Sequence, residues 1–272
     1  MLENQGLEKS LTVDRLTVEI YRERKLMGQA VASAVAEKMK ELLTQKTNLN
    51  MIFAAAPSQN EFLKALGNIP GIDWPRVNAF HMDEYLGLTS EAPQRFGVFL
   101  RERLFNRVKP GNVYYLVNDD PNLTGKPSPA IQAEAIKTEC VRYTRLLRDN
   151  PVDIVCMGIG ENGHIAFNDP PLADFNDPNL LKPVQLDERS RIQQVHDGCF
   201  ASLDEVPTHA LTLTIPALTA AKYIYCIVPS LHKREAVHRT LRGPITPDCP
   251  ATILRNHSQA RLYLDHDSAG DL

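Results

Sequence analysis

The chain has 272 residues, of which 43% are hydrophobic and 23% charged, which is enough for one sizeable buried core in a globular protein. Its 30 Lys and Arg residues against 33 Asp and Glu residues leave a formal net charge of -3. This balance excludes a global basic field that would recruit nucleic acid or an acidic membrane surface. Any anionic substrate must therefore be held by local groups.

The sequence also carries no signal for a membrane or an oxidising compartment. Charges are scattered through the first 20 residues, without the apolar run of a signal peptide, and no stretch approaches the roughly 18 apolar residues of a membrane span. The five cysteines are odd in number and form no CxxC pair, which argues against a disulfide framework. We therefore expect a cytoplasmic protein with reduced thiols.

Apolar periodicity predicts alternating helices and strands along the chain. The first helix is expected over 24–43, followed by a strand over 48–56 that stops at Pro57 and a helix over 61–66. The alternation continues with strands over 76–82, 112–117, 152–159, 209–214, 223–228 and 261–264, and with helices over 95–107, 130–147 and 231–241.

This alternation predicts an α/β fold with a mainly parallel, Rossmann-like sheet and helices on both faces, in a single domain covering 1–272. In such sheets a ligand lies beyond the carboxyl ends of the strands. Polar loops fall there at 57–59, 81–85 and 161–169. The segment 169–179 is rich in Pro, Asp and Asn and is interpreted as a lid or a linker.

Two of these loops contain candidate chemistry. Asp83 and Glu84 directly follow an apolar strand, and the strand period would point them in opposite directions, so that one faces a pocket. Adjacent acids at a strand end more often form a solvated turn or a helix cap. The second loop, GIGENGH over 158–164, is therefore the more specific signal.

The glycines of this second loop match GxGxxG, but no clear acidic residue closes a strand about 20 residues further on, so a dinucleotide site is weakly supported. Glycine here allows a ligand to approach the backbone closely, as at Gly160. His164 shares the loop with Asn162 and Asp169, which could orient its ring. That arrangement favours acid-base work over a purely structural histidine.

The paired motifs HMDEYLGL (81–88) and GIGENGHIAFNDP (158–170) resemble those of glucosamine-6-phosphate deaminases, whose relatives include 6-phosphogluconolactonases. The similarity covers most of the chain and extends to four further stretches: AAPSQ (55–59), ALTLTIPAL (210–218), SLHKREAV (230–237) and LYLDHDSA (262–269).

The resemblance implies that Asp83 is the base that moves a proton from C2 to C1 of the open-chain amino sugar, and that His164 opens the pyranose ring. It implies loss of ammonia to give fructose 6-phosphate, with no metal and no organic cofactor. The partner implied is a small phosphorylated amino sugar, with neither nucleic acid nor membrane. Related enzymes occur in several assembly states, with a homo-oligomer favoured.

The chain departs from the family pattern at two places. Asn162 and Asp169 stand where many members carry Asp and Glu beside the histidine. The family's Thr-Gly-Gly-Thr phosphate loop corresponds to Ala55-Ala56-Pro57-Ser58, in which proline removes a donor and Ser58 keeps a hydroxyl. Lys233 matches the phosphate lysine, and the phosphate arginine aligns near Gln194, with Arg189 and Arg191 close by.

The resemblance implies two groups of candidate site residues. The candidate catalytic residues are Asp83, His164, Asn162 and Asp169, and the candidate substrate-binding residues are Ser58, Glu84, Gly160, Lys233, Gln194 and Arg191. The expected reaction is isomerisation with deamination of an amino sugar 6-phosphate or a close variant. Lactone hydrolysis and non-catalytic binding of a sugar phosphate stay open as alternatives.

Overall fold

The computed structural model describes residues 5–125, 127–170 and 172–272. It contains the strands β1 (Leu7–Val13), β2 (Leu16–Tyr21), β3 (Leu49–Phe53), β4 (Val77–His81), β5 (Asp83–Tyr85), β6 (Asn112–Tyr114), β7 (Ile154–Met157), β8 (Leu181–Gln185), β9 (His209–Leu213), β10 (Tyr223–Val228) and β11 (Ala260–Asp265). Its helices are α1 (Arg24–Gln45), α2 (Asn60–Leu66), α3 (Phe96–Leu100), α4 (Asn106–Val108), α5 (Pro129–Asp149), α6 (Glu188–His196), α7 (Ile215–Thr219), α8 (Arg234–Arg242) and α9 (His266–Ala269).

The main sheet has the strand order β1-β2-β11-β10-β7-β3-β4-β6. The pairing is parallel from β2 to β6, and only β1 joins its neighbour β2 in the antiparallel sense. The predicted α/β fold with a mainly parallel sheet is therefore confirmed. The N-terminal hairpin of β1 and β2 has no counterpart in the sequence prediction.

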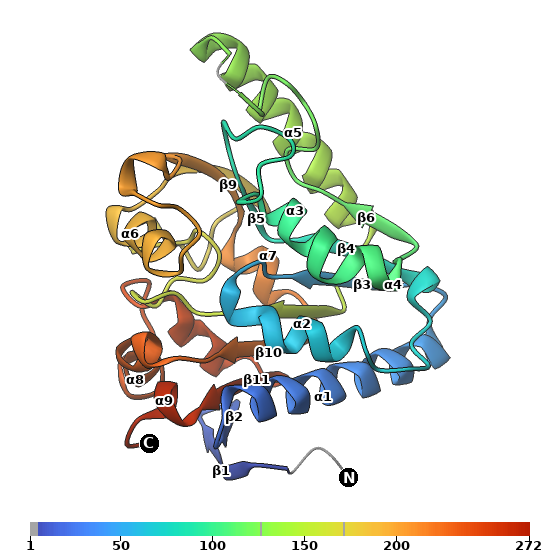
Figure 1. The fold of residues 1–272 in the computed structure, drawn as a ribbon, viewed down its shortest axis with the longest axis vertical. Helices are drawn as coiled ribbons and strands as arrows, with labels where there is room; N and C mark the ends of the chain where they lie inside the picture. The colour runs from blue at the N-terminus through green and yellow to red at the C-terminus, as the bar shows by residue number, and fades with distance from the viewer. Residues whose placement is uncertain (1–4, 126, 171) are drawn as a thin grey trace.

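Helices cover both faces of this sheet because its central strands bury side chains on both sides (Figure 1). In β3, Ile52 packs into one apolar cluster, with residues of α5, α7 and α8, whereas Met51 and Phe53 pack into the other, with α1, α2 and α3. This alternation follows from the two-residue period of a strand.

A second, smaller sheet of antiparallel strands has the order β5-β9-β8. The strand expected over 209–214 exists as β9, but it belongs to this sheet rather than to the parallel one. Asp83 in β5 pairs with Thr212 in β9. The motif over 81–88 therefore runs from the end of β4 in the parallel sheet into the antiparallel sheet. The segment 169–179 contains no helix or strand in its described part.

The chain reverses its direction of winding between β3 and β7. From β3 it proceeds to β4 and β6, whereas from β7 it proceeds to β10 and β11 on the other side. A reversal of this kind leaves a crevice at the carboxyl ends of the two central strands, because the connecting helices diverge there. None of the helices in the described ranges combines the length and hydrophobicity needed to cross a bilayer.

Candidate active site

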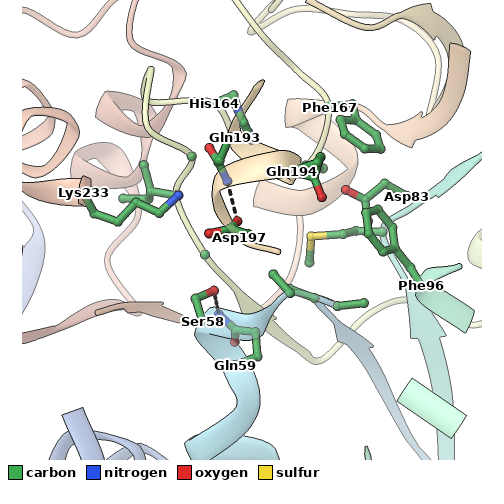
Figure 2. A pocket seen from close by; sticks show the side chains of 18 residues that line it. Ser58, Gln59, Asp83, Phe96, His164, Phe167, Gln193, Gln194, Asp197 and Lys233 are labelled. Carbon is green, nitrogen blue, oxygen red and sulfur yellow. Dashed lines mark hydrogen bonds between the residues drawn. The ribbon is translucent and has the colours of Figure 1, made fainter. Parts of the chain in front are cut away.

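A cavity lies at this reversal, and its walls come from distant parts of the chain (Figure 2). The residues that follow β3, β4 and β7 supply Ala54 to Ala56, Asp83 at the start of β5, and Gly158 to Gly160. The end of α6 and the start of α8 complete the wall with side chains that include Gln194 and Lys233. The three polar loops predicted to meet at the strand ends do so.

Asp83 faces one side of the cavity, beside Phe96 and Phe167 (Figure 2). Its side chain is buried, and this burial, together with the neighbouring charge of Glu84, raises the pKa of the Asp83 carboxyl well above its usual value. A carboxylate with a raised pKa is a stronger base than an ordinary one, so the site suits proton abstraction near neutral pH.

Glu84 points away from the cavity, as the strand period predicts for the neighbour of Asp83. Its carboxylate accepts hydrogen bonds from the backbone N–H groups of Tyr85, Phe96 and Gly97 at 3.0 to 3.1 Å, and Arg95 lies 3.6 Å away. Burial raises the Glu84 pKa to about 7 against the opposing effect of these partners. The structure thus corrects the expectation that Glu84 binds substrate, because its oxygens are engaged by the start of α3.

His164 is held by its Nδ1 atom. This atom lies 2.7 Å from Asn162 Oδ1, 2.9 Å from Asp169 Oδ1 and 3.0 Å from Ser190 Oγ. Two of these neighbours are acceptors, so they fix the tautomer with the proton on Nδ1. The Nε2 atom is then left to exchange a proton with a ligand in the cavity.

Asp169 is the anionic partner of this histidine. Burial alone would raise the Asp169 pKa, but the His164 ring and hydrogen bonds from Asn162 and Ser190 outweigh it and hold the pKa below its usual value. Asp169 therefore stays ionised and can stabilise an imidazolium on His164. Neither Asn162 nor Asp169 lines the cavity, so both act through the ring.

Gly160 lies against the ring of His164. A Cβ on Gly160 would come within 2.1 to 2.4 Å of three ring atoms, which is closer than any side chain can approach. Gly163 adopts φ +90°, a conformation that favours glycine. Gly160 thus makes room for the histidine ring, and it also lines the cavity, as predicted for a position where a ligand approaches the backbone.

The other side of the cavity is formed by Lys233, Asp197, Ser58 and Gln59 (Figure 2). Lys233 is only 5% exposed, and burial lowers the pKa of its ammonium group although Asp197 and Glu161 oppose the shift. Gln59 Nε2 donates to Ser58 Oγ at 3.2 Å. The predicted residues Ser58, Lys233 and Gln194 thus line the same cavity as Asp83 and His164.

Arg191 lies elsewhere. Its guanidinium donates to the backbone oxygens of Leu203 and Val206 at 2.7 and 2.9 Å, so it braces the chain after α6 instead of lining the cavity. Arg189 is exposed. The expectation that Arg191 binds substrate is corrected accordingly.

Helix α6 supplies functional side chains that the sequence analysis missed. Ser190 contacts both His164 and Asp169, while Gln193 and Asp197 line the cavity. Their spacing of i, i+3 and i+7, with Gln194 at i+4, places them on one helical face. This spacing is visible in the sequence, but a search for apolar periodicity overlooks a helix whose buried face is polar.

No group of three or more His, Cys, Asp and Glu side chains in the described residues is placed to hold a metal ion. The five cysteines are free, and Cys156 and Cys226 are fully buried.

Comparison with known proteins reveals clear relatives. A glucosamine-6-phosphate deaminase of Listeria monocytogenes serotype 4a is 32% identical over 250 residues, which cover 92% of this chain and 97% of the relative. A glucosamine-6-phosphate deaminase of Bacillus cereus strain B4264 is 34% identical over 197 residues, covering 72% of this chain and 68% of the relative.

Solved structures agree with these relatives. A monomeric glucosamine-6-phosphate deaminase superimposes with a TM-score of 0.80 at 27% identity, covering 93% of this chain and 98% of the other. A 6-phosphogluconolactonase of Thermotoga maritima shares the fold with a TM-score of 0.68 at 22% identity, covering 91% and 98%. The model of the family described as glucosamine-6-phosphate isomerases/6-phosphogluconolactonase matches residues 22–263, and the chain belongs to this family.

Proposed function

We propose that the chain isomerises and deaminates an amino sugar 6-phosphate, glucosamine 6-phosphate or a close variant, to a ketose phosphate and ammonia. The observation that carries this proposal is that Asp83 and His164 face one cavity while the second ring nitrogen of His164 is anchored. The deaminase names of relatives that align over nearly the whole chain support it.

The geometry assigns a role to each group in the proposed reaction. His164 Nε2 exchanges a proton with the ring oxygen of the sugar and opens the pyranose, and Asp169 stabilises the imidazolium that forms. Asp83 then removes the proton from C2 of the open chain and returns it to C1. Water adds at C2 of the resulting imine and ammonia leaves, so the ketone oxygen comes from water and the products balance.

Three finer expectations accompany this proposal. A cytoplasmic location agrees with the free cysteines, and a single domain over 1–272 agrees with the family match to 22–263. A homo-oligomer stays a prediction, and one structural relative is monomeric.

The test is ammonia release by the purified protein. Glucosamine 6-phosphate, galactosamine 6-phosphate and the two unphosphorylated amino sugars would be compared, with hydrolysis of 6-phosphogluconolactone measured in parallel. Release from an amino sugar that is lost in Asp83→Asn supports the proposal. Lactone hydrolysis without ammonia release, or no turnover by a folded protein, contradicts it.

A further inference from the structure

The hydroxyl group of Ser190 is buried beside His164 but does not reach the ligand cavity. The side chain is 2% exposed and is not among the residues that line the cavity. Its Oγ donates a hydrogen bond to Asp169 Oδ1 and lies 3.0 Å from His164 Nδ1. A buried hydroxyl group costs free energy unless it is hydrogen-bonded, and within the described residues Asp169 and His164 are the partners of this one.

The charge of Asp169 sets the direction of the hydrogen bonds around the ring. An ionised carboxylate only accepts, so the single proton of Ser190 Oγ points to Asp169 and a lone pair is left toward His164 Nδ1. The Asn162 amide is oriented in the same way, because its Nδ2 donates to Asp169 Oδ1 at 2.8 Å while its Oδ1 lies 2.7 Å from Nδ1. All three neighbours of Nδ1 therefore present acceptors to its proton.

Ser190 is the neighbour of His164 that comes from a different element. Asn162, His164 and Asp169 belong to the segment that follows β7, whereas Ser190 belongs to α6. Asp169 Oδ1 is the oxygen that all three partners contact, and Asp169 Oδ2 is buried without a hydrogen-bond partner in the described part of the chain. The hydroxyl group of Ser190 thus fixes the carboxylate relative to the rest of the protein.

Helix α6 also forms part of the cavity wall. Its buried residues are Ser190, Gln193 and Gln194, and the two glutamines line the cavity (Figure 2). Gln193 Oε1 also accepts a hydrogen bond from the N–H of Glu161 at 2.8 Å, so α6 holds the segment that carries His164 at a second point. The position of α6 therefore sets the position of the histidine ring relative to a ligand at this wall.

We infer that Ser190 is a positioning residue for proton exchange by His164. Its hydroxyl group holds the Asp169 carboxylate against Nδ1 from α6, which keeps the proton on Nδ1 and leaves Nε2 free to exchange a proton with the ligand. The inference rests on the proposed function for the reaction and adds to it a residue that does not line the cavity. Because Ser190 acts through the ring, its loss should reduce turnover and leave substrate affinity unchanged.

The first experiment compares steady-state kinetics of Ser190→Ala and the wild-type protein, with ammonia release from the preferred amino sugar 6-phosphate as the readout. The kcat of Ser190→Ala is expected to fall by about tenfold or more, which corresponds to loss of a hydrogen bond to a charged group. KM is expected to change by less than about twofold. Ser190→Thr keeps the hydroxyl group and is expected to retain most of the wild-type kcat.

The second experiment observes the ring without any substrate. In protein labelled with 15N at histidine, the Nδ1–H signal of His164 is the one that is missing from His164→Gln among the eight histidines. In the wild-type protein this proton is surrounded by acceptors and is expected to exchange slowly with water. In Ser190→Ala its exchange is expected to be faster by about tenfold or more, and in Ser190→Thr it should stay slow.

The matched control is Ser268→Ala. Ser268 is also a buried serine, and its Oγ donates to the backbone oxygen of Asp265 at 3.2 Å, but it belongs to α9 and does not line the cavity. The substitution removes the same group from a buried site elsewhere in the fold. Wild-type kcat and wild-type exchange of the His164 Nδ1 proton are expected in this variant.

The outcomes separate this inference from the proposed function. Wild-type kcat in Ser190→Ala overturns the inference, as does a lower kcat with wild-type exchange of the Nδ1 proton. An equal loss in Ser268→Ala or in Ser190→Thr also overturns it, because packing and not the hydroxyl group would then be responsible. If no amino sugar phosphate releases ammonia, the proposed function fails, and the exchange measurement still decides whether Ser190 holds the ring.

Discussion

The imidazole ring of His81 fixes the backbone of Asp83. Its Nε2 accepts a hydrogen bond from the N–H of Leu116 at 2.9 Å, so the proton must be on Nδ1, which donates to the carbonyl oxygen of Asp83 at 2.9 Å. Burial, aided by the charges of Arg95 and Arg142, lowers the His81 pKa to about 3. His81 therefore stays neutral, and pH effects on activity report on other groups.

Asp83→Asn is expected to abolish exchange of the C2 proton of the substrate with solvent. An amide cannot accept that proton, and loss of a general base costs about 10²- to 10⁴-fold in rate. Exchange into deuterated water, followed by NMR, measures this step directly. Binding of the unreactive open-chain probe 2-amino-2-deoxyglucitol 6-phosphate should persist, and full exchange activity in the variant would remove Asp83 from the role of base.

Asp83→Asn should also be more stable than the wild-type protein by an amount that increases with pH. Because the folded-state pKa of Asp83 is raised, the folded protein holds this proton where the unfolded chain has released it, so stability falls as pH rises from about 4 toward the raised pKa. The amide side chain of the Asp83→Asn variant does not titrate. The gain in Tm of the variant over wild type should therefore be larger at pH 8 than at pH 4, and a gain that shrinks with pH would contradict the assignment.

Glu84→Gln is the natural counterpart of Asp83→Asn. The Glu84 carboxylate receives three backbone N–H groups, and an amide with a single oxygen leaves at least one of these buried donors poorly satisfied. We expect a loss of about 1–3 kcal/mol in the free energy of unfolding, measured by urea denaturation. The turnover of the folded variant should fall far less than in Asp83→Asn, and a comparable loss would show that Glu84 takes part in the chemistry.

Gly160→Ala should impair catalysis by displacing the His164 ring. The added methyl group would overlap ring atoms that Asn162 and Asp169 hold in place. A displacement of about 1 Å can cost around 10²-fold in kcat. Gly67→Ala is the control, since the atoms nearest to its Cβ would belong to the flexible end of Arg107, and wild-type kcat is expected there. Unchanged turnover in Gly160→Ala would show that the ring tolerates movement.

Asn162→Asp should lower turnover. Asn162 Nδ2 donates to Asp169 Oδ1 at 2.8 Å while Asn162 Oδ1 lies 2.7 Å from His164 Nδ1, so the substitution replaces a hydrogen bond by two carboxylates in contact beside the ring. Steady-state kinetics measure the loss, with Asn162→Ser as the uncharged comparison. Wild-type turnover in Asn162→Asp would show that the contact between Asn162 and Asp169 does not position the ring.

The order of elements in the parallel sheet could be predicted because apolar runs alternate with helical periodicity. The strand predicted over 223–228 matches β10 residue for residue. Strands β5 and β8 could not be found in the same way, because β5 has three residues and β8 includes Pro183. Their pairing with β9 depends on contacts that are distant in sequence, which local patterns do not encode.

The candidate site likewise contains some residues that local sequence patterns locate and others that depend on distant contacts. Asp83 and His164 follow strands, so their convergence at the sheet edge is a consequence of topology. Arg191 was misplaced because side-chain direction on a polar helix depends on packing, whereas Glu84 was assigned to the substrate by resemblance although the strand period turns it away from Asp83. Asp197 was not considered, since a single acidic residue after a helix of polar residues resembles ordinary surface.

The position of β11 between β2 and β10 has a consequence for synthesis on the ribosome. The N-terminal hairpin emerges first, but the inner edge of β2 finds its parallel partner only when residues 260–265 have been made. Until then β2 presents unpaired backbone groups, which are prone to pair with other chains. The nascent chain can therefore close its sheet only after β11 has been made, and truncation before β11 should leave a product that depends on chaperones and aggregates without them.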